Sequence, residues 1–183
     1  MRSFFIFGVF AAVFGLLVTP FDRSQASAVS GSAVSPNLVV SQFQAGGGSA
    51  NDEFIEIHNL TNSPINVGGF KINGSNASGS TGTRVTFNPG TIIPAKGFLL
   101  VTNNAAGNSY SGTVPGDQTY ITGVTDDGGI ALLNASNQVI DAVGMSSGSA
   151  YKEGTVLAPQ VANANASYRR KGGNCSPAQD TDN

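Results

Sequence analysis

Apolar and polar residues alternate in this chain over short runs, and that spacing is typical of β-strands. In residues 53–58 (EFIEIH), Ile55 and Ile57 share one face, whereas Glu56 and His58 share the other with Phe54. Clusters of glycine, asparagine and proline separate such runs, and no stretch repeats with helical spacing. The pattern predicts eight short strands, at 38–43, 53–58, 65–73 (with a bulge or bend at Gly68-Gly69), 84–87, 98–102, 130–133, 139–143 and 167–170, and a ninth, weakly paired at an edge, at 120–124.

Many short strands divided by turn residues are typical of a two-sheet sandwich or a barrel. The composition agrees, because the chain has 24 glycines and few of the residues that build helices. The sequence therefore predicts an all-β fold.

The N-terminus has the pattern of a secretory leader. Arg2 precedes an apolar run at 4–18 (FFIFGVFAAVFGLLV), and a small-x-small site follows at Ala26-Ser27-Ala28. The run is shorter than the ~20 residues of a spanning helix. We expect a signal peptide at 1–28, the alternative being an uncleaved anchor, and a secreted or cell-surface protein with no membrane span in the mature chain.

The rest of the chain has room for one domain. Residues 29–36 are interpreted as an extended linker ending at Pro36, and residues 37–183 as one β-sandwich domain. Cys175 is the single cysteine, so no disulfide can form within the chain.

No catalytic constellation is evident in the sequence. His58 is the single histidine, and its strand position predicts an exposed or half-exposed side chain. Asp52-Glu53 is interpreted as a turn and a solvated strand end, and Asp126-Asp127 as part of a hairpin turn. We expect no enzyme activity, no catalytic residue and no cofactor.

Two polar runs near the C-terminus are candidate binding sites. Oxygen atoms of Asp180, Asp182 and Asn183 are spaced so that they could converge on Ca²⁺, although the glycine and distal glutamate of an EF-hand loop are missing. The basic run Arg169, Arg170 and Lys171 is a candidate for an anionic ligand, or else a solvated rim.

Three segments resemble the lamin tail domain family in its exported bacterial form. Residues 52–72 (DEFIEIHNLTNSPINVGGFKI) carry the most specific motif, and residues 130–143 (IALLNASNQVIDAV) resemble the hairpin of the family, with Asp141 at its aspartate position. A third match begins at 167–170 (SYRR) and continues through Cys175 to DTDN. Family members continue with a further apolar strand, so the last strand is expected to be missing or to form differently here. The first motif is carried by Glu53, Phe54, Ile55, Glu56, Ile57, Asn59, Val67, Gly69 and Phe70.

The resemblance implies an immunoglobulin-like β-sandwich that acts as a non-catalytic binding or tethering module. Its partner would be a protein or a cell-surface polymer. Because bacterial relatives also occur joined to exported nucleases, the alternative is a nucleic-acid-binding accessory domain. The formal net charge of −2 disfavours that alternative. Its contacts would come from Arg169, Arg170, Lys171, Lys71 and Arg84.

Overall fold

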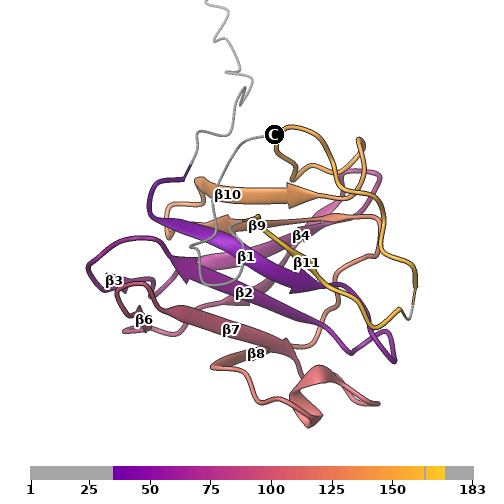
Figure 1. The fold of residues 1–183 in the computed structure, drawn as a ribbon, viewed down its shortest axis with the longest axis horizontal. Helices are drawn as coiled ribbons and strands as arrows, with labels where there is room; N and C mark the ends of the chain where they lie inside the picture. The colour runs from indigo at the N-terminus through magenta and orange to yellow at the C-terminus, as the bar shows by residue number, and fades with distance from the viewer. Residues whose placement is uncertain (1–34, 163, 172–183) are drawn as a thin grey trace, which may run out of the picture. The chain divides into compact units, whose positions relative to one another are not determined.

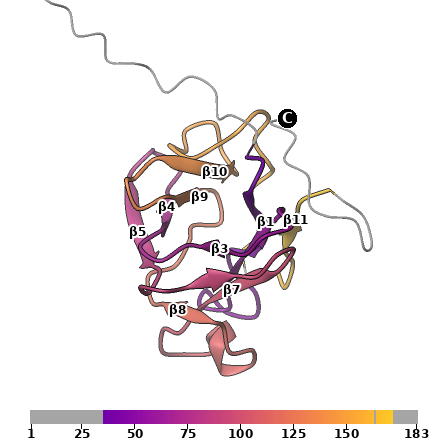
Figure 2. The same cartoon turned by 90° about the vertical axis from the view of Figure 1, so that its left-hand side faces the viewer.

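The computed structural model describes residues 35–162 and 164–171. Its strands lie in one compact unit, residues 31–183. Figure 1 shows two main sheets in this unit, and Figure 2 shows β4, β5, β9 and β10 on one side of it and β1 and β11 on the other. The five-stranded sheet has the order β11 (Tyr168–Arg169), β1 (Leu38–Gln44), β2 (Phe54–Asn59), β7 (Phe98–Asn103), β8 (Gln118–Tyr120). The four-stranded sheet has the order β10 (Val139–Gly144), β9 (Gly129–Leu133), β4 (Lys71–Ser75), β5 (Thr81–Thr86).

Pairing within the two sheets is antiparallel, except that β8 runs parallel to β7 at one edge. A short pair, β3 (Ile65–Asn66) with β6 (Ile92–Ile93), lies beside them, and the helical part of the described chain is one 3₁₀ turn, Tyr110–Gly112. No helix in the described ranges is long and apolar enough to cross a membrane.

The hydrophobic core lies between the inward faces of the two sheets. The five-stranded sheet contributes alternate residues such as Phe43, Ile55 and Val101, and the four-stranded sheet contributes Ile72 and Ile130. Burying each such side chain stabilises the fold by about 1.5–3 kcal/mol. The predicted all-β, immunoglobulin-like sandwich is therefore confirmed.

The prediction of a single strand at 65–73, interrupted by a bulge or bend, was wrong, because the segment divides into β3 and β4, which belong to different sheets. Asn66 Oδ1 accepts the Gly68 amide (2.9 Å), and the Phe70 amide donates to the Val67 carbonyl (3.0 Å). Gly69 has a φ of 81°, the left-handed region that favours glycine. This turn ends β3 and sends β4 into the other sheet.

Candidate functional site

A buried ion pair joins the two sheets where β10 approaches β1. Asp141 on β10 is completely buried, and its Oδ2 accepts the Val40 amide at 2.5 Å. Arg170, just after β11, donates from Nη2 to Asp141 Oδ1 at 2.5 Å and from Nε to the Val40 carbonyl at 3.0 Å. The ion pair thus satisfies both the amide and the carbonyl of Val40, as a neighbouring strand would do.

Irregular pairing makes this contact possible. The register of β1 with β2 shifts between Val40 and Gln42, and the register of β10 with β9 shifts between Val139 and Asp141. An extra residue in a strand redirects the side chains that follow it. The shift in β10 accompanies the placement of Asp141 between the sheets, where its carboxylate reaches β1.

The same edge contains a groove of about 300 Å³. Its apolar walls include Phe43, Leu157 and Tyr168, and the rings of Phe43 and Tyr168 lie 5.6 Å apart, centroid to centroid. Arg169 and Lys171 are exposed residues that also line it. The groove therefore combines an apolar interior with positive charge at the surface.

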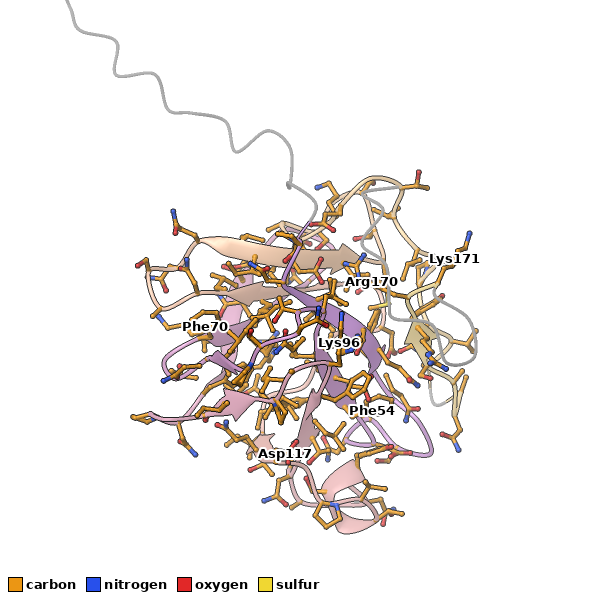
Figure 3. All side chains as sticks on the ribbon, turned by 60° about the vertical axis from the view of Figure 1, so that its left-hand side comes forward. Phe54, Phe70, Lys96, Asp117, Arg170 and Lys171 are labelled. Carbon is orange, nitrogen blue, oxygen red and sulfur yellow. The ribbon has the colours of Figure 1, made fainter. Side chains whose placement is uncertain are left out.

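The structure separates the roles of the three basic residues proposed from sequence. Arg170 is committed to Asp141, and its Nη2 also lies 3.5 Å from Glu153 Oε2. Arg169 and Lys171 have no ion-pair partner within the described chain. Figure 3 shows Arg170 close to the sheet and Lys171 further out. Any anionic ligand at this edge would therefore meet Arg169 and Lys171 rather than Arg170.

The other two basic residues considered for nucleic acid belong to the four-stranded sheet. Lys71 on β4 donates to Asn137 Oδ1 at 2.6 Å, and Arg84 on β5 donates to the Gly82 carbonyl at 3.1 Å. The Arg84 guanidinium also covers Gly74 so closely that a Cβ there would lie 2.6 Å from it. Neither residue lines the groove.

Glu53 is buried, so the prediction of a solvated strand end was wrong for this residue. It is 1% exposed, its Oε2 accepts from Asn103 Nδ2 (2.9 Å), and its Oε1 accepts from the Val124 amide (3.1 Å). Burial raises its pKa to about 7, and the two hydrogen bonds lower it by less than burial raises it. The sequence pattern could have indicated this burial, because Glu53 precedes the core residues Ile55 and Ile57 at the same alternate spacing.

Glu53 belongs to a buried polar cluster with Tyr120 and Arg84. The Tyr120 hydroxyl and Arg84 Nε are buried without a partner at hydrogen-bond geometry in the described residues. Both groups nevertheless lie near enough to lower the pKa of Glu53. The pKa of Tyr120 is raised well above its usual value, first by burial and then by the Glu53 carboxylate.

His58 is also buried, at 5% exposure, so the prediction of an exposed or half-exposed side chain was wrong. Its ring stacks on Phe98 with centroids 4.2 Å apart, because β2 and β7 place the two residues opposite each other. Burial lowers the pKa of His58. The residue therefore forms part of the packing against Phe98.

Loops at one end of the sheets form two further hollows, of about 530 and 500 Å³. Asp126 and Asp127 line the first, and Asp52 lines the second. Burial and the neighbouring Asp127 raise the pKa of Asp126. No group of three His, Cys, Asp or Glu residues in the described ranges is placed to hold a metal ion. The Ca²⁺ candidates Asp180, Asp182 and Asn183 lie outside those ranges.

The comparisons with known proteins agree with the geometry. The family model of the Lamin Tail Domain matches residues 31–147, more than half of the chain. This chain belongs to the lamin tail domain family. No curated protein matches it.

Lamin tail domains are non-catalytic, immunoglobulin-like modules, which agrees with the fold of this chain. The matched range contains Glu53 and Asp141, whereas Arg170 lies beyond it. The ion pair thus connects the lamin tail core to the segment that follows it. That segment also supplies the basic residues of the groove.

Proposed function

We propose that this lamin tail domain is an exported, non-catalytic binding or tethering module. Its partner, a protein or a cell-surface polymer, docks in the groove beside β11. The observation that carries the proposal is the groove itself, in which apolar side chains adjoin two exposed cations, Arg169 and Lys171. Concave, mostly apolar surfaces with a few polar groups are typical of binding sites.

The setting of the groove supports this function. The Asp141–Arg170 ion pair holds one wall in place, because it ties β10 and the segment after β11 to the backbone of Val40. A rigid scaffold reduces the entropic cost of ordering the site when a partner binds. The secretory pattern at residues 1–28 supports a partner outside the cytoplasm.

Retention on bacterial surface fractions tests the proposal. The full chain, with a C-terminal affinity tag, is expressed in a secreting bacterium, and the exported product is incubated with whole cells, cell-wall polymer and secreted proteins. We expect retention on one fraction, reduced at least fivefold by the double variant Arg169→Glu, Lys171→Glu. Lys71→Glu, the same charge reversal on the other sheet, should change nothing. Folded protein that no fraction retains, or retention that ignores the groove substitutions, would contradict the proposal.

Nucleic-acid binding, the alternative, has less support. It would draw on Lys71 and Arg84, and neither residue lines the groove with Arg169 and Lys171. It predicts DNA binding that weakens steeply with salt. We expect no shift of DNA mobility, even at low ionic strength.

A further inference from the structure

We infer that the groove binds an acidic, extended peptide segment of a partner protein, with an apolar side chain seated between Phe43, Leu157 and Tyr168. This inference rests on the proposed function and names the chemistry of the partner. It follows from three properties of the same edge: the apolar interior, the cationic rim and the open strand β11.

The interior of the groove is suited to apolar side chains. Phe43 is buried, Leu157 and Tyr168 are partly buried, and Val143 adds a further apolar surface. A volume of about 300 Å³ is at the small end of the ~300–1,000 Å³ that ligand pockets have. The space therefore fits one or two side chains better than a bulky sugar polymer.

The rim selects for negative charge. The chain as a whole is acidic, with a formal charge of −2, whereas the exposed charges at this groove, Arg169 and Lys171, are positive. The acidic groups nearby, Asp141 and Glu153, both contact Arg170. Exposed rim charges act mainly on the association rate and on partner choice. Acidic residues flanking the apolar anchor would complement this rim.

The open strand favours an extended peptide. β11 pairs with β1 on one side, and no strand of the described chain pairs with its other side. An unpaired strand edge can accept a peptide strand through main-chain hydrogen bonds, while alternate side chains enter adjacent pockets. An anionic polysaccharide could meet the rim charges, but it would use neither the strand edge nor the apolar interior.

Synthetic probes test the inference by fluorescence anisotropy with the exported protein. The first probe is a decapeptide of alternating Glu and Leu. The second replaces Glu with Lys, the third replaces Leu with Ser, and the fourth is dextran sulfate. We expect the Glu/Leu peptide to bind at least tenfold more tightly than the Lys/Leu and Glu/Ser peptides. Its affinity should fall as salt is raised.

Variants locate the binding. The double variant Arg169→Glu, Lys171→Glu should bind the Glu/Leu peptide at least tenfold more weakly than the unsubstituted protein does. It should also bind the Lys/Leu peptide more tightly than the Glu/Leu peptide. Leu157→Ala should lower the affinity for both leucine-containing peptides equally, because it removes part of the apolar wall. Lys71→Glu should leave all affinities unchanged. Circular dichroism spectra that match the unsubstituted protein would confirm that each variant is folded.

The outcomes separate this inference from the proposed function. Equal binding of the Glu/Leu and Lys/Leu peptides, or binding of dextran sulfate alone, would overturn the inference that the ligand is an acidic peptide. Retention on a bacterial fraction without binding of the Glu/Leu peptide would also overturn it, while the proposed function would stand. Loss of retention on every fraction would remove the proposed function itself.

Discussion

Glu53 is an acidic residue in a core position, and its environment makes stability depend on pH. Its pKa is about 7 in the folded protein, compared with the ordinary 4.5 that applies to the unfolded chain. The folded state therefore binds the proton more tightly. The stabilising contribution is complete below pH 4.5 and is lost as the pH rises through 7.

Urea unfolding at several pH values measures this effect. The raised pKa corresponds to a loss of up to about 3 kcal/mol in the free energy of unfolding between pH 4.5 and 7. The Glu53→Gln side chain cannot titrate, so the free energy of unfolding of this variant should not fall in this way between pH 4.5 and 7. Glu56→Gln, three residues further along the chain in β2 and only half-buried, should keep the pH dependence. If the free energy of unfolding of the Glu53→Gln variant fell equally over this pH range, another titrating group would be the cause.

Arg170 and its neighbour Arg169 are expected to differ sharply in their effect on stability. Arg170→Met would leave Asp141 as a buried charge without its cation, and it should lower the free energy of unfolding by about 3–5 kcal/mol. Arg169→Met removes an exposed charge and should change stability by no more than about 0.5 kcal/mol. Chemical denaturation of the two variants at pH 7 checks this. Similar stabilities would contradict the structural role of the ion pair.

At the scale of elements, alternation located most strands because one face of each sheet is buried. It failed at 65–73, where nine residues with a strand-like pattern belong to two different sheets. The information that divides them is local, in the turn from Asn66 to Phe70. A glycine pair can mark either a bulge within one strand or a turn between two, so the pattern alone does not distinguish them.

The turn at Gly69 gives a prediction at this scale. A side chain at its φ of 81° is strained, so Gly69→Ala should lower the free energy of unfolding by about 1–2 kcal/mol. Gly112→Ala is the matched control, because a Cβ there would meet no atom within 4 Å. Thermal unfolding followed by circular dichroism compares the two. Equal melting temperatures would indicate that the backbone at Gly69 relaxes without cost.

At the scale of the whole molecule, the sequence predicted the fold and singled out the basic run 169–171, but neither the apolar residues that line the groove with it nor the partners of its side chains. Arg169, Arg170 and Lys171 look alike in sequence, yet Arg170 forms an ion pair with Asp141 on another strand. That pairing depends on how closely β1 and β10 approach, which no local pattern determines. The burial of His58 likewise depends on the register that sets Phe98 opposite it.

Export is a prediction about the whole molecule, and it is open to direct test. The leader pattern predicts cleavage after Ala28, because small side chains at 26 and 28 fit the site of the signal peptidase. N-terminal sequencing of the exported protein should begin at Val29. Leu17→Arg places a charge in the apolar run and should retain the full chain inside the cell.

Ala28→Phe distinguishes a cleaved leader from an uncleaved anchor. A bulky residue at the cleavage site should block processing while the apolar run still directs export, so this variant should stay with the membrane at its full length. The unsubstituted protein should be released in its shorter form. If both proteins remain membrane-bound at full length, the N-terminus is an anchor. In that case the groove beside β11 would act at the cell surface, where a tethering module would hold its partner against the cell.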